Sequence, residues 1–431
     1  MHTVLQALFL HLVCIIHIRK IFIVSYAKGL FCKECGRDYP IEPINVCDFC
    51  FGPLEVTYDY ESMSNYVSRD KIVKGPHSMW RYSDFLPVDS ANAVDINAGF
   101  TPLIKSENMG RSLGLENLYF KNDSVNPSFS FKDRVVAVAS TKAKEFGFDT
   151  LACASTGNLA GSVAAHAARS GMRSFVFIPA DLEVGKIVGA AIYGTTLVAV
   201  DGSYDDVNRL CSELSDTYNW AFVNINMRPY YSEGSKTLGF EVSEQLGWRA
   251  PDNCIVPGAS GSLFTKIWKG MNEFATAGLI DAPKTKMFIG QAEGCSPIIS
   301  AYDAKDFAIR PVKPDTIAKS LAIGNPADGY FALKVIQETN GGGYAVPEQD
   351  IADGIKDLAE MEGIFTEPAG GVVIATLKHL ARTGQIRPEE TTVAFITGNG
   401  YKTREVVEHV ANPVLIKPTF ASFEEAIGVR L

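Results

Sequence analysis

The sequence lacks any run of basic residues interleaved with aromatic ones, the pattern that marks many nucleic-acid-binding proteins. Its formal net charge is −9, so nucleic acid is not an expected partner. Cysteine is also scarce, with nine in 431 residues at uneven spacings. Because secreted disulfide scaffolds carry cysteine at much higher density, this scarcity favours a reducing, cytoplasmic location.

The N-terminus lacks the order of features found in a secretory signal. Residues 4–16 are nearly all apolar, and Arg19 and Lys20 follow this run instead of preceding it. A signal peptide has its positive charges first and ends in a small-residue cleavage site. The run is also too short to span a bilayer. We favour an unusual hydrophobic extension over residues 1–28, with a membrane anchor or a helix packed on the domain as alternatives, and we expect no membrane partner.

From residue 118 onward, short β-branched runs alternate with longer amphipathic segments. This alternation is typical of βαβ units and parallel sheets. The expected helices include 131–146, 159–169, 204–218 and 235–246. The expected strands are 118–121, 151–154, 174–178, 197–200, 222–225, 254–256, 287–291 and 393–397. The sequence therefore predicts a doubly wound α/β fold with mostly parallel sheets.

A short segment near the N-terminus differs in composition from the rest. Residues 32–58 are rich in Cys, Pro, Gly and aromatic residues and show no helical period. Their two CxxC pairs have the spacing of a tetrahedral zinc ribbon; the four cysteines are Cys32, Cys35, Cys47 and Cys50. Reduced cysteines without metal are the alternative. We predict a zinc-ribbon-like module over residues 29–60, with structural zinc and no catalytic part, followed by a catalytic region over residues 61–431.

Lys132 stands where a polar loop meets the start of an apolar helix, within the string NPSFSFKDR at residues 126–134. A lysine held there, near the positive charge of Arg134, can lose its proton and form a Schiff base with an aldehyde cofactor. A surface lysine paired with Asp133 is the alternative. The residues alone leave both open.

Two expected strand-to-helix turns offer donors to anionic ligands. Residues 154–162 read ASTGNLAGS, in which Ser155 and Thr156 could hold a carboxylate and Asn158 could bond a phenolate oxygen. Residues 257–262 read PGASGS and could hold a phosphate. Ligands of open α/β sheets bind at the carboxyl ends of strands, and helix N-termini favour anions. An ordinary turn with Asn158 as the N-cap remains the alternative for the first.

The last expected strand ends in the string TGNG at residues 397–400. The Thr397 hydroxyl at that edge could bond a ring nitrogen, and a neutral hydroxyl would not hold a pyridine protonated. Read alone, the string is better interpreted as a glycine-rich turn.

Taken together and in this order, these four strings resemble threonine synthase. The resemblance runs from about residue 29 to the C-terminus, and further strings agree with it: MWRY at 79–82, GFTPL at 99–103, EGSKT at 233–237, TIAKS at 316–320, IGNP at 323–326 and EPAGG at 367–371. The resemblance implies the fold shared with the β chain of tryptophan synthase, which is the fold-type II class of pyridoxal-phosphate enzymes with two α/β domains. We also expect a homodimer.

By this resemblance, Lys132 carries pyridoxal 5′-phosphate and moves the substrate's protons. Asn158 bonds the cofactor's ring oxygen, and Thr397 faces its ring nitrogen. The implied reaction converts O-phospho-L-homoserine and water to L-threonine and phosphate. The implied phosphate cradle consists of Gly258, Ala259, Ser260, Gly261 and Ser262.

The chain departs from many members of that family near the expected substrate phosphate. Leu159 replaces a common Thr and Ala322 replaces a common Arg, so neither position offers charge or a hydrogen bond. A buried dianion without partners is strongly disfavoured. We therefore predict that Arg228, Lys236 and Ser155 supply the missing groups.

Two other functions compete with this interpretation. A related replacement or elimination enzyme, such as a cysteate synthase or a threonine dehydratase, would use the same cofactor residues. A catalytically silent interaction protein would have lost them, yet Lys132, Asn158 and Thr397 are all present. The sequence favours the enzyme.

Overall fold

The computed structural model describes residues 25–155, 157–180, 182, 184–202, 204–410 and 412–428. Most of the expected hydrophobic extension, residues 1–24, lies outside the described residues, and so does Thr156. Within the described residues, no helix combines the length and the apolar character needed to cross a membrane.

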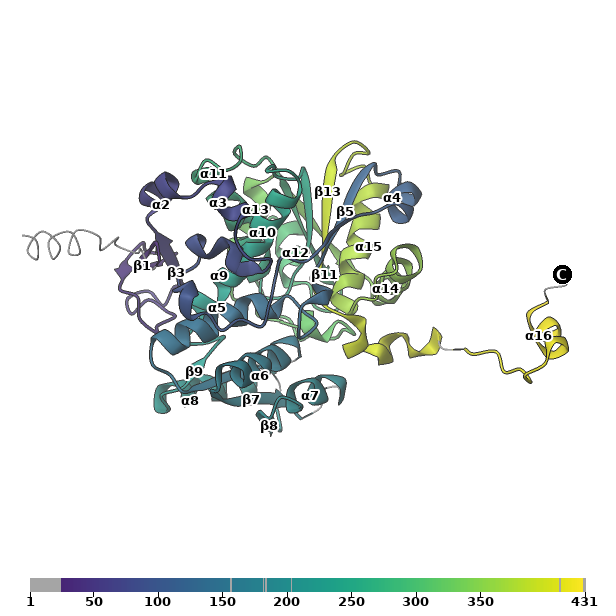
Figure 1. Ribbon diagram of the computed structural model, residues 1–431, viewed down its shortest axis with the longest axis horizontal. Helices are drawn as coiled ribbons and strands as arrows, with labels where there is room; N and C mark the ends of the chain where they lie inside the picture. The colour runs from purple at the N-terminus through teal and green to yellow at the C-terminus, as the bar shows by residue number, and fades with distance from the viewer. Residues whose placement is uncertain are drawn as a thin grey trace, which may run out of the picture.

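The cysteine-rich segment folds into a small antiparallel sheet. Its central strand β1 (Ala27–Cys32) lies between β2 (Asp38–Tyr39) and β3 (Leu54–Tyr58). Side chains of β3 alternate between buried and half-buried, as expected when one face of a strand covers a core. The short helices α2 (Tyr60–Tyr66), α3 (Arg69–Val73) and the 3-10 helix η1 (Met79–Phe85) then lead into the main body (Figure 1).

The larger of two further sheets has six strands in the order β12-β11-β10-β13-β5-β4. All neighbours pair in parallel except β4 and β5, which pair antiparallel. The strands are β4 (Leu103–Lys105), β5 (Asn117–Asn122), β10 (Asn253–Pro257), β11 (Lys286–Ala292), β12 (Gly342–Val346) and β13 (Thr391–Ile396).

Alternate side chains of this sheet enter two different cores, so both faces are buried. Val393 and Phe395 of β13 pack into one core, whereas Ala394 and Ile396 pack into the other. Such fully apolar strands are typical of parallel sheets covered on both sides. One face is covered by α10 (Thr237–Gln245), α11 (Ser262–Thr276), α12 (Pro297–Asp303) and α13 (Gly329–Glu338), and the other by α4 (Asn108–Leu113), α14 (Glu348–Glu362) and α15 (Pro368–Arg382).

The smaller sheet has four parallel strands in the order β8-β7-β6-β9. In β6, Leu151 and Cys153 face one core and Ala152 and Ala154 face another. Its strands are β6 (Thr150–Ala154), β7 (Arg173–Pro179), β8 (Thr196–Val200) and β9 (Ala221–Phe222), and its helices are α5 (Lys132–Glu145), α6 (Asn158–Ser170), α7 (Val184–Ala191) and α8 (Tyr204–Thr217).

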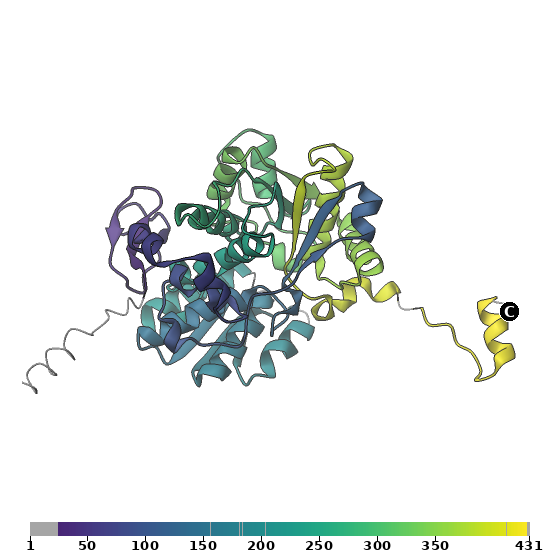
Figure 2. The ribbon, with the colours of Figure 1, turned by 45° about the horizontal axis from the view of Figure 1, so that its top comes forward.

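The two sheets belong to interleaved parts of the chain, because β6 to β9 are inserted between β5 and β10. Figure 2 separates the small-sheet part from the large-sheet part, with the cysteine module beside them. The predicted doubly wound, mostly parallel α/β fold is confirmed. Seven of the eight predicted strands match observed strands, the eighth, 222–225, overlaps β9 only at Phe222, and β4 and β12 are additional in the two larger sheets.

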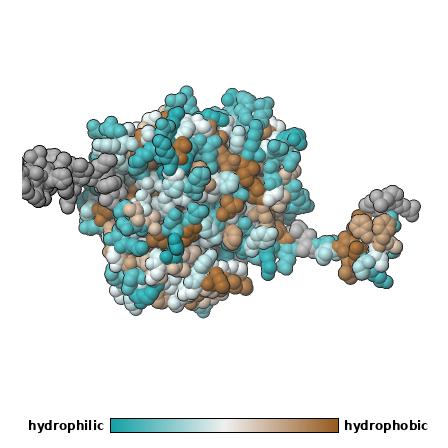
Figure 3. Space-filling view, in the orientation of Figure 1, coloured by the Kyte–Doolittle hydropathy of each residue, from teal (hydrophilic) through white to brown (hydrophobic). Residues whose placement is uncertain are grey.

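The chain ends in a helix that extends away from the body. Residues 412–419 lead to α16 (Phe420–Ile427), which lies apart from both sheets (Figure 1). Its apolar side chains Phe420, Phe423 and Ile427 are exposed, and the segment is partly brown in Figure 3.

Candidate functional site

A cavity of about 440 Å³ lies at the carboxyl ends of β6, β10 and β13. Ligands of open α/β folds bind at this edge. Nine predicted site residues line it: Lys132, Ser155, Asn158, Arg228, Ala259, Ser260, Gly261, Ser262 and Thr397. Gly258 lies directly before the loop that lines the cavity, and Lys236 is not in the lining.

Lys132 is the first residue of α5 and presents its amine to the cavity. Its Nζ donates to the Tyr231 hydroxyl at 2.9 Å. Burial lowers the pKa of the Lys132 amine to about 8, against an opposing effect of the Glu367 carboxylate. The alternative pairing with Asp133 is not formed, because that carboxylate accepts hydrogen bonds from the Ser128 backbone N–H and the Ser162 hydroxyl instead. About a tenth of the amine is therefore neutral at pH 7.

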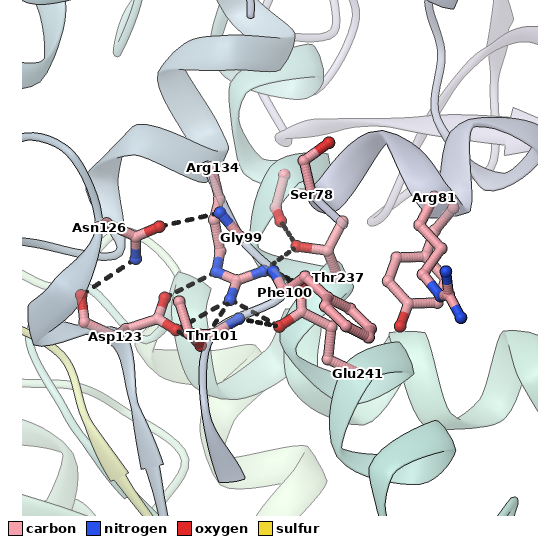
Figure 4. Close-up of polar contacts among 12 residues, drawn as sticks. Ser78, Arg81, Gly99, Phe100, Thr101, Asp123, Asn126, Arg134, Thr237 and Glu241 are labelled. Atoms are coloured by element: carbon pink, nitrogen blue, oxygen red, sulfur yellow. Dashed lines mark hydrogen bonds and ion pairs between the residues drawn. The ribbon is translucent and has the colours of Figure 1, made fainter. Parts of the chain in front are cut away.

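Arg134, two residues further along α5, is absent from the cavity lining and lies in a buried ionic network (Figure 4). Its Nε lies 2.6 Å from Asp123 Oδ2, and its Nη2 lies 2.8 Å from Glu241 Oε2. Glu241 also pairs with the fully buried Lys121 at 2.6 Å. The network balances the charge of Arg134. The expectation that Arg134 lowers the Lys132 pKa was therefore wrong, since burial is the cause.

Asn158 begins α6 and is held by a carboxylate from a distant part of the chain. Its Nδ2 donates to both oxygens of Glu367, each at 2.8 Å, and its buried Oδ1 has no partner among the described residues. A Cβ on Gly398 would overlap the Glu367 carboxylate, so only glycine fits there. Glu367 thus orients Asn158 and leaves one amide oxygen for a ligand.

The loop from Gly258 to Ser262 joins β10 to the N-terminus of α11. The Gly258 N–H donates to the Gly290 carbonyl at 2.7 Å and continues the sheet. Gly261 has φ +91°, and a Cβ there would lie 2.8 Å from the Asp328 carbonyl oxygen. Close approach of this backbone therefore requires glycine. The Ser262 N–H at the start of α11 donates weakly to Ser260 Oγ at 3.4 Å, and a helix N-terminus of this kind favours anions.

Thr397 follows β13 and its side chain is buried. Its carbonyl accepts from the Phe131 N–H at 2.9 Å, so the end of β13 is attached to the residue before Lys132. The nearby Ser130 Oγ is buried without a partner in the described part of the chain. The structure thus places Thr397 and Lys132 at one edge of the cavity.

The two cations proposed for the substrate phosphate lie in different surroundings. Arg228, the first residue of α9 (Arg228–Glu233), lines the cavity and donates to Asp328 Oδ2 at 2.8 Å. Lys236 is fully buried, with its Nζ 2.7 Å from Glu233 and 2.8 Å from Glu273. The expectation for Lys236 is corrected on geometric grounds, because two carboxylates enclose its ammonium outside the cavity lining.

The other residues considered for substrate binding are only partly free to contact a substrate. The Ser155 hydroxyl accepts from the Gly157 N–H at 3.1 Å and the Ala160 N–H at 3.0 Å, so it stabilises the start of α6. Leu159 lines the cavity as an apolar wall, whereas Ala322 is not in the lining. The prediction for Thr156 falls outside the described residues.

Sequence reasoning missed several residues of the cavity wall, among them Asn45, Tyr231, Asp328 and Glu367. Of these four, only Glu367 carries a sequence signal, since it begins the EPAGG string at 367–371. Tyr231 reaches Lys132 from 99 positions away. No local pattern reveals such a contact.

The four predicted cysteines converge at one side of the small antiparallel sheet. Their Sγ atoms all lie within 4.8 Å of one another. Cys32 Sγ lies 3.4 Å from Cys50 Sγ, and Cys35 Sγ lies 3.6 Å from Cys47 Sγ. The arrangement is compatible with a zinc-ribbon module.

Comparison with known proteins adds family relationships to this geometry. The family model described as "Pyridoxal-phosphate dependent enzyme" matches residues 94–398. A threonine synthase of Methanocaldococcus jannaschii is 39% identical over 374 residues, covering 86% of this chain and 92% of that protein. A threonine synthase of Methanosarcina acetivorans is 37% identical over 402 residues, covering 92% and 98%.

Solved structures agree on the fold. The processed form of threonine deaminase isoform 2 from Solanum lycopersicum has a TM-score of 0.62 at 22% identity, covering 81% of this chain and 88% of that chain. Diaminopropionate ammonia lyase from Escherichia coli also has a TM-score of 0.62, at 17% identity, covering 74% and 89%.

Proposed function

The chain belongs to the threonine synthases of the pyridoxal-phosphate dependent enzyme family, and we propose that it is a lyase converting O-phospho-L-homoserine and water to L-threonine and phosphate. One observation supports this most strongly: the Lys132 amine, the oriented Asn158 and the α11 loop line a single cavity. These are the groups that the family resemblance assigns to the cofactor.

The cavity fits pyridoxal phosphate on three grounds. The Lys132 amine is buried and has a lowered pKa, and the loop before α11 forms a glycine-lined cradle. The buried Asn158 Oδ1 has no partner among the described residues and, as an acceptor, can take a hydrogen bond from the cofactor's ring hydroxyl. When bound, the cofactor supplies an aldehyde and an electron sink for the substrate's carbon atoms. Lys132, Asn158 and Thr397 would hold its ring, and the loop of Gly258, Ala259, Ser260, Gly261 and Ser262 would hold its phosphate.

The chain's own residues then have separable tasks. Lys132 accepts and returns protons at the substrate's carbons, because a buried amine with a pKa of about 8 can do both near neutral pH. The Tyr231 hydroxyl, 2.9 Å from Nζ, restricts where that amine lies. Glu367 fixes Asn158 through its amide N–H. Leu159 contributes apolar wall that limits water.

The substrate phosphate needs positive charge within the cavity. Apart from Lys132, Arg228 is the cation in its described lining. The Arg228 side chain is 26% exposed and pairs with Asp328. An incoming phosphate can therefore compete with Asp328 for the guanidinium, in the bidentate geometry that arginine favours. We assign the phosphate to Arg228 and keep Ser155 and Thr156 as candidates for the substrate carboxylate.

A structural zinc ion is proposed for the cysteine module. Four thiols converge within 4.8 Å, which suits a closed tetrahedral site. Metal analysis of the purified protein should find one zinc per chain. A folded, active protein without zinc would contradict this assignment.

The proposal extends to the compartment and the oligomeric state of the protein. We propose a cytoplasmic homodimer. None of the eight cysteines in the described residues forms a disulfide, which supports the reducing compartment. Light scattering with size exclusion tests the dimer. A monomer at working concentration would contradict it.

The activity is tested by incubating the holoenzyme with O-phospho-L-homoserine and measuring L-threonine and phosphate. Equal amounts of the two products are expected. Two other outcomes would overturn the proposal in favour of the competing functions. Formation of 2-oxobutanoate from threonine, without turnover of the phosphate ester, would indicate a threonine dehydratase. Cysteate formed from phosphoserine and sulfite would indicate a cysteate synthase.

A further inference from the structure

The cysteine module is bonded to α9, the helix that carries two cavity residues. The Tyr230 hydroxyl donates to the Glu42 carbonyl of the module at 2.7 Å. The Tyr58 hydroxyl of β3 donates to Glu233 Oε2 at 2.6 Å. Glu233 is fully buried, and Lys266 of α11 joins it to Glu55 of β3. Both the middle and the end of α9 are thus attached to the module.

The opposite side of the same helix forms cavity wall. Tyr231, next to Tyr230, accepts from the Lys132 amine at 2.9 Å. Arg228 at the start of the helix lines the cavity. Because neighbouring residues of one short helix cannot move independently, a displacement of Tyr230 also displaces Tyr231. The module therefore helps to set the position of the Lys132 amine.

The module also contributes a residue to the cavity lining directly. Asn45, two residues before Cys47, is half-buried and lines the cavity together with Arg228 and Lys132. Its backbone carbonyl accepts from Leu54 of β3 at 3.1 Å, which fixes the loop to the sheet. Its side-chain amide has no hydrogen-bond partner within the described residues. The loop is thus fixed at a residue of the cavity lining whose amide is available to a ligand.

We propose that the cysteine module forms a wall of the active site, in which Asn45 binds the substrate's phosphate beside Arg228 and Tyr230 positions Tyr231 against Lys132. This assignment rests on the proposed function only in naming the phosphate ester. It gives the module a part in turnover, which the sequence interpretation did not. The Asn45 amide N–H is the donor, and the phosphate oxygen is the acceptor.

The role of Asn45 is tested by Asn45→Ala in the holoenzyme. Losing a hydrogen bond to a charged group weakens binding by on the order of tenfold to hundredfold, so KM for O-phospho-L-homoserine should rise by that factor with little change in kcat. The inhibition constant of inorganic phosphate should rise in parallel. Asn45→Gln should recover part of the loss. Asp38→Ala, at an exposed position of the same module, serves as the matched control and should change neither constant.

An unchanged KM and an unchanged phosphate inhibition constant in Asn45→Ala would overturn the role of Asn45. Failure of the proposed function is a separate result, because it appears as absent threonine formation in the wild type. In that case calorimetric binding of inorganic phosphate to wild-type and Asn45→Ala holoenzyme still decides the role of Asn45. Equal affinities would contradict it.

The role of Tyr230 is tested by Tyr230→Phe, which removes only the hydroxyl bonded to Glu42. Among the described residues, Tyr231 of α9 accepts a hydrogen bond from Lys132, and the charge of Glu367, the residue before α15, also acts on it. Movement of Tyr231 should shift the acidic limb of the pH profile of kcat/KM and alter the pH dependence of the visible absorption of the holoenzyme. A profile and a spectrum identical to those of the wild type would show that Tyr230 acts in packing alone.

Discussion

The first turn of α5 places two cationic side chains in opposite surroundings. Arg134 is fully buried between Asp123 and Glu241, and each guanidinium nitrogen has a partner (Figure 4). Lys132 faces the cavity, where a phenol hydroxyl is its hydrogen-bond partner. Other polar atoms of that cavity, Asn158 Oδ1 and Asn224 Oδ1, have no partner within the described residues.

This difference separates charged side chains that stabilise the fold from polar side chains that are available to a ligand. Buried polar groups in folded proteins are normally satisfied, and removing one partner of a buried ion pair is costly. The Arg134 network follows this rule and anchors α5. The cavity departs from it, because its polar groups are completed only when a ligand binds. The two regions should therefore respond in opposite ways to substitution.

The largest effect is expected for Lys132→Met. Removal of the amine eliminates the proton carrier and the cofactor attachment, so activity should fall by at least about 10⁴-fold. Stability toward urea should be equal or higher, because a partly uncompensated amine has been replaced by an apolar side chain. Lys144→Met, at an exposed position of the same helix, is the control. A strongly destabilised Lys132→Met protein would show that Lys132 stabilises the fold as Arg134 does.

Arg134→Met should mainly lower stability, in contrast to Lys132→Met, which should mainly remove activity. It leaves Asp123 and Glu241 without their main partner in a buried site, which costs about 3–5 kcal/mol in the free energy of unfolding. Urea titration followed by circular dichroism measures this loss. Arg134→Lys should recover only part of it, since lysine lacks the planar fork of donors. A loss below about 1 kcal/mol would show that the network is not structural.

Arg228 shares features of both regions, because it pairs with Asp328 and also lines the cavity. Arg228→Ala tests which of the two roles it has. If it receives the substrate phosphate, the substitution should raise KM for O-phospho-L-homoserine and cost about 2–4 kcal/mol in kcat/KM. The visible absorption of the holoenzyme should stay normal. Arg209→Ala, an exposed arginine of α8, is the control. Unchanged kinetics would assign Arg228 to a structural pair with Asp328.

The smallest effect is expected in the pH dependence of cofactor uptake and of apo-protein stability. The pKa of the Lys132 amine is about 8 in the folded protein, against roughly 10.4 in an unfolded chain. Uptake of pyridoxal phosphate by the apo-protein needs the neutral amine, so its rate should rise about tenfold per unit below pH 8 and level off above it. The unfolded chain binds the extra proton between these pKa values, so Lys132 should make apo-protein stability rise with pH across this window. A rate that still rises beyond pH 9 would contradict the lowered pKa.

Much of the fold could be predicted because its strands are apolar on both faces. The runs at 151–154 and 254–256 become β6 and β10 within one residue at either end. β12 could not be predicted, because it begins with glycines at 342 and 343 that resemble a turn. A Cβ on Gly343 would overlap Ile299, so close packing explains the glycine there. Such tertiary contacts leave no local pattern.

The cofactor side of the cavity could be predicted from strand-to-helix turns, whereas the substrate side could not. Turns place Asn158 and Gly261 through local geometry. Lys236 was misassigned because its two carboxylate partners are decided by packing of α9 against α11. Asn45 and Tyr231 reach the cavity only because the cysteine module packs on α9 and α9 packs on α5, contacts between segments far apart in the sequence.

The most direct test of the central claim is to identify the lysine that carries the cofactor. The holoenzyme is reduced with borohydride, digested and mapped by mass spectrometry. We expect the pyridoxyl label on Lys132 alone. Lys402 is the sharpest competitor, because burial also lowers its pKa and its Nζ lies 3.3 Å from the Ser128 carbonyl oxygen. A label on Lys402, or on any lysine other than Lys132, would contradict the assignment of Lys132 as the lysine that carries the cofactor.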